Sequence, residues 1–208
     1  YGERDTAELV GNVSGKFGPV GLSVGGNYYR TDGISAFSEA RGGTEPDGFE
    51  SLGANAKLDI ALGENFSIDL RGFYADSEVE IDGFPAPVFT LADTDDVSKS
   101  EGWSGFGRMT VQTGGVRHRL SLSASDLERD TRSSFSSQFQ GDRQVWRWDM
   151  DGTGGEGRLT WAAGLERRDE AAELDSGLSD ELGTTSAFGT VLFPVGSRIT
   201  LSGALRFD

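Results

Sequence analysis

Residues 51–74 read SLGANAKLDIALGENFSIDLRGFY, and this stretch decides the fold. Every second position of its first half is small or apolar: Leu52, Ala54, Ala56, Leu58, Ile60 and Leu62. After Gly63-Glu64 the alternation resumes with Phe66, Ile68, Leu70, Gly72 and Tyr74. Successive side chains of a β-strand point to opposite faces, so a period of two predicts two strands joined by a tight turn.

The same period recurs along the whole chain, and no stretch of helical periodicity competes with it. Leu120 and Leu122, for example, alternate with Arg119 and Ser121. We predict ten strands, at 6–17, 20–31, 51–62, 65–80, 102–113, 116–130, 141–151, 156–172, 184–193 and 197–208. The predicted fold class is all-β.

The predicted connections alternate between tight turns and long links. The turns are Gly18-Pro19, Gly63-Glu64, Gly114-Gly115, 152–155 and 194–196. The links cover 32–50, 81–101, 131–140 and 173–183, and are rich in Gly, Ser, Asp and Glu. A β-sandwich also alternates, but its strands are usually about 5–6 residues long. Strands of about ten residues with alternating short and long connections are typical of an antiparallel up-and-down transmembrane β-barrel.

Composition excludes several classes of partner and site. The net charge of −15 argues against a nucleic-acid partner, which requires a basic surface. Cysteine is absent, so disulfides and thiolate metal sites are excluded. The apolar share of 36% would fill a soluble core poorly, whereas a large barrel can have a polar interior. No stretch reads as a secretory signal or a membrane-spanning helix.

Several segments of the sequence resemble those of a known protein family. YYRTDGISAF (28–37), EPDGFESLGANAKLDIALGENFSIDLRGFYADSEVEIDGFP (45–85) and AAGLERRDE (162–170) are similar to strands of TonB-dependent outer-membrane receptors. The closest likeness is to the vitamin B12 (cobalamin) transporter-like branch. The resemblance implies a barrel of roughly 22 strands filled by an N-terminal plug domain. It also implies outer-membrane lipid, the inner-membrane TonB energy-coupling complex and a small nutrient ligand as partners.

The chain departs from that family pattern. We find no plug-like segment, no energy-coupling box and no terminal strand ending in an aromatic residue. We therefore predict that residues 1–208 are part of one β-barrel domain, an open segment of about ten strands from which the plug and remaining strands are absent. The first and last predicted strands, 6–17 and 197–208, should then not pair with each other.

Carboxylates near two of the links are candidate metal ligands. Calcium takes six to eight oxygen ligands, which closely spaced carboxylates can supply. The resemblance adds that cobalamin transporters order their outer loops with calcium. The candidate calcium ligands are Asp76, Glu80, Asp93, Asp95 and Asp96. The alternative is a solvated acidic loop.

Other residues of the links are candidates for ligand capture at one rim: Asp47, Glu50, Asp82, Phe84, Asp175 and Asp180. No catalytic residue is predicted. His118, the sole histidine, is in register with Leu120 and Leu122 on the predicted lipid face, where a structural role is expected. The run GTGGEGR (152–158) lacks the ending of a phosphate loop and is interpreted as a turn.

The leading hypothesis is the barrel portion of a bacterial outer-membrane receptor for active uptake of a scarce nutrient. A cobalamin-like corrinoid is the first predicted ligand and a ferric chelate the second. Two alternatives belong to other classes: a passive outer-membrane channel or porin, and a non-membrane β-domain that binds a ligand.

Overall fold

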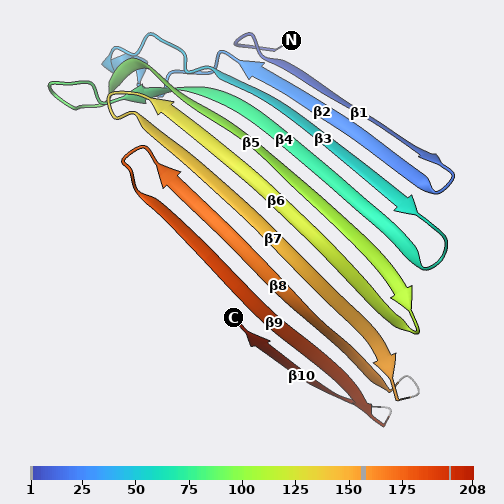
Figure 1. Ribbon diagram of the computed structural model, residues 1–208. Helices are drawn as coiled ribbons and strands as arrows, with labels where there is room; N and C mark the ends of the chain where they lie inside the picture. The colour runs from blue at the N-terminus through green and yellow to red at the C-terminus, as the bar shows by residue number, and fades with distance from the viewer. Residues whose placement is uncertain (1, 156–157, 197) are drawn as a thin grey trace.

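The computed structural model describes residues 2–155, 158–196 and 198–208. They form a single antiparallel sheet of ten strands in sequence order (Figure 1). The strands are β1 (Ala7–Phe17), β2 (Val20–Thr31), β3 (Phe49–Ala61), β4 (Phe66–Gly83), β5 (Ala92–Thr113), β6 (Val116–Arg132), β7 (Ser137–Gly154), β8 (Leu159–Leu174), β9 (Ser179–Val195) and β10 (Ile199–Phe207). The all-β, up-and-down prediction is confirmed.

The only helical turn in the described residues is the short 3-10 helix η1 (Glu39–Arg41), in the connection between β2 and β3. No helix in the part of the chain that the structure describes is long and apolar enough to cross a membrane.

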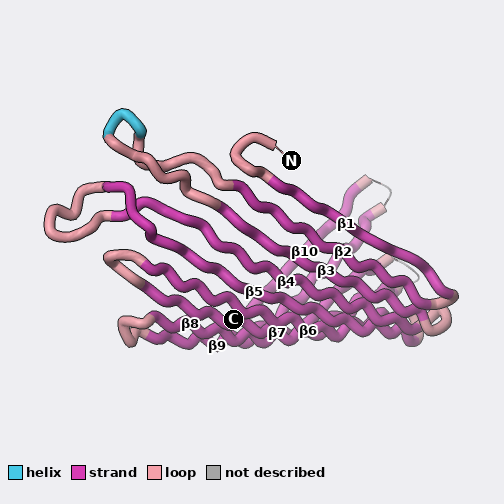
Figure 2. The backbone as a smooth tube through the Cα atoms, turned by 90° about the horizontal axis from the view of Figure 1, so that it is seen from above, coloured by secondary structure: helices cyan, strands magenta, loops and turns pink. Residues whose placement is uncertain are grey.

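The sheet is open. Among the described residues β1 pairs only with β2, and β10 pairs only with β9, as predicted. Seen from above, the sheet is curved rather than flat (Figure 2). The tight turns gather at one end of the strands and the longer connections at the other (Figure 1). Gly18 and Gly63 have φ of 59° and 76°, a left-handed conformation that glycine adopts without strain in such turns.

Three of the four predicted long links are wrong in length. The strands on either side extend into them, and only 84–91, 133–136 and 175–178 remain as connections. We predicted strand ends where the alternation of apolar residues stopped. The backbone ladder continues past that point, however, because hydrogen bonding between strands does not require an apolar face. The predicted strand starts at 156 and 197 lie outside the described residues.

Cross-strand register sorts the side chains onto two faces. We call one the leucine face, which carries Leu58, Ile60, Leu120, Leu122, Leu201 and Leu205 together with their cross-strand neighbours. The opposite one, the arginine face, carries Lys57, Arg71, Arg119, Arg147, Arg168 and Arg206. The predicted alternation, with Leu120 and Leu122 on one face and Arg119 and Ser121 on the other, is confirmed.

The sheet has no apolar core of its own. No hydrophobic residue in the described part of the chain is buried, and large apolar side chains such as Leu70, Leu120 and Leu165 are 43–51% exposed. Apolar surface is stable only when it is removed from water. The leucine face therefore requires a cover that this sheet does not supply.

Candidate functional site

The leucine face carries an apolar belt that begins at the tight turns. It ends, toward the longer connections, at Tyr28, Tyr74, Trp103 and Trp146. The stretches between turn and aromatic residue are 20–28, 66–74, 103–113 and 146–154, and none has an ionisable side chain on this face. A tilted strand needs about 9–11 residues to cross the apolar part of a membrane, and these stretches have that length.

An acidic band follows the belt on the same face. Beyond Tyr74, β4 presents Asp76, Glu78 and Glu80 where it had presented Ile68 and Leu70. The band continues across the sheet with Glu50, Glu101, Asp126, Glu128, Asp130, Asp142, Asp169 and Glu173. Fewer cationic side chains lie among them on the same face: Arg30, Lys99, Arg132 and Arg167. The side chains of this face therefore change from apolar to acidic at the level of the aromatic residues.

Side chains of the band interact with one another across the strands. The Tyr74 hydroxyl donates a hydrogen bond of 2.9 Å to Glu101. Asp126 and Asp142 are direct cross-strand partners. Burial and then the Asp126 carboxylate raise the pKa of Asp142, because both disfavour its ionised form.

The connection 32–48 is fastened to the sheet by carboxylates. The Gly48 amide donates to Glu80 at 2.8 Å, and the Thr44 amide donates to Asp93 at 2.8 Å. Asp47 accepts from the amide of Ala36 within the connection. Beside it lies an open hollow of about 470 Å³, whose lining includes Arg30, Asp32, Glu45, Phe49, Glu50 and Glu80. Burial, and then the nearby Asp95, raise the pKa of Glu45.

The predicted ligand-capture residues all lie toward the longer connections, but at two separate places. Asp47, Glu50, Asp82 and the 47%-exposed Phe84 belong to the β2–β5 end of the sheet. Asp175 and Asp180 belong to the β8–β9 hairpin, where Asp175 accepts a hydrogen bond from the Gln138 amide. Of the six residues, only Glu50 lines the hollow.

The predicted calcium ligands lie in strands rather than in a loop: Asp76 and Glu80 in β4, and Asp93, Asp95 and Asp96 in β5. In the described ranges no group of three acidic or histidine side chains is close enough to hold a metal ion. Four oxygens at this hairpin are nevertheless buried without a hydrogen-bond partner among the described residues: Asp82 Oδ2, Asp93 Oδ1, Thr94 Oγ1 and Asp96 Oδ2. These hard oxygen donors are the kind that calcium prefers, but they do not form a complete coordination shell.

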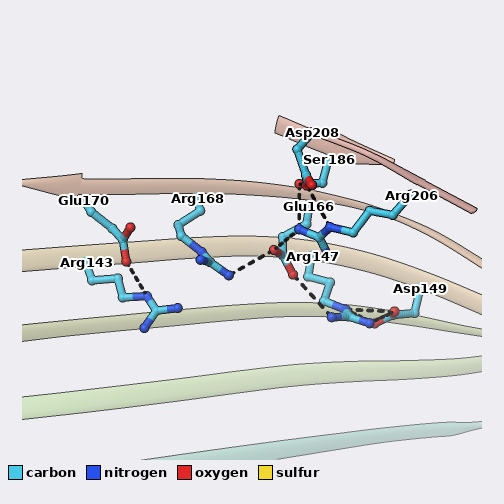
Figure 3. Close-up of polar contacts among 9 residues, drawn as sticks. All are labelled: Arg143, Arg147, Asp149, Glu166, Arg168, Glu170, Ser186, Arg206 and Asp208. Carbon is cyan, nitrogen blue, oxygen red and sulfur yellow. Dashed lines mark hydrogen bonds and ion pairs between the residues drawn. The ribbon is translucent and has the colours of Figure 1, made fainter. Parts of the chain in front are cut away.

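The arginine face centres on Glu166 of β8, whose side chain is 7% exposed (Figure 3). Its carboxylate oxygens lie 3.3 Å from Arg147 of β7, 3.3 Å from Arg168 of β8 and 3.5 Å from Arg206 of β10. Arg147 also pairs with Asp149 at 2.7 Å. One buried carboxylate thus joins guanidinium groups from three strands.

A second polar feature of this face is a hollow of about 430 Å³ over β5, β6 and β7. It is lined by Phe106, Arg108, Arg119, Ser121, Ser123, Val145, Arg147 and Asp149. The alternation in the sequence placed Arg119 and Ser121 on the face opposite to Leu120, but we did not predict the positions of Arg147, Arg168 and Asp149 on it. The alternation with Trp146 and Trp148 could have revealed Arg147 and Asp149.

His118 shares the leucine face with Leu120, and its ring stacks on Trp148 at 6.2 Å between centroids. This packing fits the structural role that was predicted for it. The run 152–158, interpreted as a turn, includes residues 156 and 157, which lie outside the described residues.

No protein-family profile and no curated protein matches the chain. Solved structures do. The ferric yersiniabactin uptake receptor FyuA from Yersinia pestis is similar with a TM-score of 0.72 and 15% identity, over 98% of this chain and 37% of that one. The siderophore receptor PiuA from Acinetobacter baumannii gives a TM-score of 0.66 and 10% identity, over 99% and 44%. The copper transporter OprC gives 0.62 and 15%, over 99% and 35%.

At these identities the likeness concerns the fold alone. The chain spans less than half the length of each of these receptors and transporters. Its ten-stranded sheet has the fold of one part of such proteins.

Proposed function

We propose that this sheet is part of the barrel wall of a TonB-dependent receptor in a bacterial outer membrane. Its leucine face would contact lipid and its arginine face would line the interior. The observation that carries the proposal is the belt closed by Tyr28, Tyr74, Trp103 and Trp146, together with the absence of a buried apolar residue in the described chain. A non-membrane β-domain would need a second layer over the same face.

The proposed ligand is a ferric chelate. The similar structures include receptors for a siderophore and for ferric yersiniabactin, and a ferric citrate transporter. None of those names mentions a corrinoid, so cobalamin-like ligands stay a prediction based on the resemblance of the sequence. As partners in the whole protein we propose a plug domain against the arginine face and the TonB complex that drives uptake.

Deleting the gene that encodes this chain is expected to abolish uptake of ⁵⁵Fe-loaded chelates at nanomolar concentration. Re-expressing the whole protein should restore uptake, and a protonophore should then block it, because the proposed transport is driven from the inner membrane. Radiolabelled cobalamin, tested in parallel, decides between the two ligand classes.

Uptake that continues in the presence of the protonophore and rises linearly with ligand concentration would instead favour the passive channel. Recovery of the whole protein from the aqueous fraction without detergent would contradict any membrane role.

Calcium binding at the β4–β5 hairpin is a second proposal. The observation in its favour is the set of buried, unpartnered oxygens from Asp82, Asp93, Thr94 and Asp96. A buried carboxylate oxygen without a partner is costly, and a divalent cation would remove that cost. The Thr94 and Asp96 oxygens both lie beside Gly83, so an ion held there would take its remaining ligands from water. Asp93 instead contacts the neighbouring connection 32–48 through the Thr44 amide.

Millimolar calcium is expected to slow protease cleavage of the connections 32–48 and 84–91 in the whole protein. Asp96→Asn should remove this protection because Asp96 supplies one of the unpartnered oxygens. Asp95→Asn is the matched control, since Asp95 is an exposed neighbour on the same strand. Cleavage that ignores both calcium and a chelator would rule the ion out.

A further inference from the structure

We infer that the hollow over β5, β6 and β7 on the arginine face binds a carboxylate, supplied by an acidic side chain of the protein segment that fills the barrel. The inference rests on the proposed function for the existence of such a segment. What it adds is the position of the contact and its polarity, with the cations on the wall and the anion on the partner.

Among the described residues, Arg108 is the cationic group of the hollow that has no ion-pair partner. Its direct cross-strand partner is Asp69, but that carboxylate is held by Arg71 through two hydrogen bonds of 2.8 and 2.7 Å. Arg108 instead lies over the ring of Phe106, 4.9 Å from the centroid. Its Nε is buried and has no acceptor among the residues that the structure describes.

The other two arginines of the hollow already have carboxylate partners. Arg119 pairs with Asp151 at 2.6 Å, and Arg147 pairs with Asp149 and Glu166. Three guanidinium groups therefore line a space to which the described residues contribute one carboxylate, that of Asp149. An additional carboxylate would satisfy Arg108, and arginine is well suited to it because its N–H groups bind carboxylates in pairs.

The hollow also has the depth and the donors of a binding site. Ser121 and Asp149 form its buried part, 5% and 9% exposed, and Ser123 adds a second hydroxyl. Its volume of about 430 Å³ accommodates an aspartate or glutamate side chain together with ordered water. The aromatic ring of Phe106 would support the aliphatic part of the entering side chain.

Charge favours a protein side chain over a free anion. The chain carries a net charge of −15. The resulting negative potential disfavours the approach of small anions from solution. A carboxylate on a segment that is folded inside the barrel is already in place, so it does not have to approach from solution against the negative potential.

The test uses the whole protein that carries this chain, in its outer membrane. Ser123→p-benzoylphenylalanine places a photo-crosslinker in the hollow, and mass spectrometry identifies the attached peptide. We expect a peptide from outside residues 1–208 that contains Asp or Glu near the attachment point. Arg108→Gln should lower the crosslink yield at least five-fold. Lys57→Gln should leave it unchanged, because Lys57 is already paired with Asp59 at 2.8 Å.

A charge swap distinguishes the loss of this ion pair from misfolding of the variant. Arg108→Glu should lose the crosslink, and replacing the identified acidic residue by lysine in the same protein should restore it. An attached peptide without an acidic residue, or a yield that ignores Arg108→Gln, would overturn the inference. So would the absence of any protein adduct in a receptor that still imports its ligand, and that result would leave the proposed function standing.

Discussion

Glu166→Gln is expected to lower the free energy of unfolding by about 3 kcal/mol, because removing one member of a buried ion pair leaves the remaining charges uncompensated. Here the carboxylate is 7% exposed and contacts Arg147, Arg168 and Arg206. We place the effect at the lower end of the range for buried pairs since the arginines are 37–45% exposed. Urea unfolding of the whole protein in detergent, followed by tryptophan fluorescence, measures it.

Glu170→Gln is the matched control. Glu170 lies on the same strand and the same face, but its side chain is 35% exposed and contacts only Arg143 among the described residues. Partly exposed pairs contribute about 0–1 kcal/mol, so this variant should unfold at nearly the wild-type urea concentration. Equal losses at the two positions would show that Glu166 is not the centre of the network.

Val191→Arg is expected to destabilise the folded barrel by about 2–4 kcal/mol, the cost of an arginine at the bilayer midplane on a lipid-facing position. Val191 lies on the leucine face of β9, between Trp161 of β8 and Gly203 of β10. It is several residues from the tight turn and therefore within the proposed apolar belt. The fraction of protein that folds in lipid vesicles, judged by its shifted mobility on unheated gels, measures the effect.

Thr190→Arg should be tolerated. Thr190 is the adjacent residue on the arginine face, its side chain is exposed, and its cross-strand neighbours Ala162 and Ala204 are small and uncharged. The two variants thus introduce the same charge at nearly the same depth and differ only in the face. Equal folding yields would contradict a membrane position for this sheet.

The two faces could be predicted from the sequence because the period of two follows directly from strand geometry. The assignment of Leu58 and Lys57, or Leu120 and Arg119, to opposite faces depends only on parity, and it holds throughout the ladders. The strand ends could not be predicted in the same way. The segment 92–101 shows no alternation of apolar residues, because it carries charged side chains such as Asp93, Asp95 and Glu101. It is nevertheless part of strand β5.

The candidate site was less predictable than the fold. Glu80 and Asp93 were predicted as metal ligands from the sequence. In the structure both accept hydrogen bonds from backbone amides of the connection 32–48. Sequence spacing does not reveal such contacts because they join residues more than thirty positions apart. The Glu166 network was hidden for the same reason: its arginines come from three strands, and only the register brings them together.

The change from Tyr74 to Asp76 on one face of β4 has a consequence for how the proposed barrel keeps its place. To slide deeper, or to withdraw through the bilayer, the sheet would have to carry the carboxylates of the acidic band into hydrocarbon. Each such group costs about 2.5–3.5 kcal/mol at the membrane centre, and the costs from neighbouring strands would add. In the proposed barrel the band would therefore hold the assembled sheet at a fixed depth, even if a force were applied to the barrel contents from the periplasmic side.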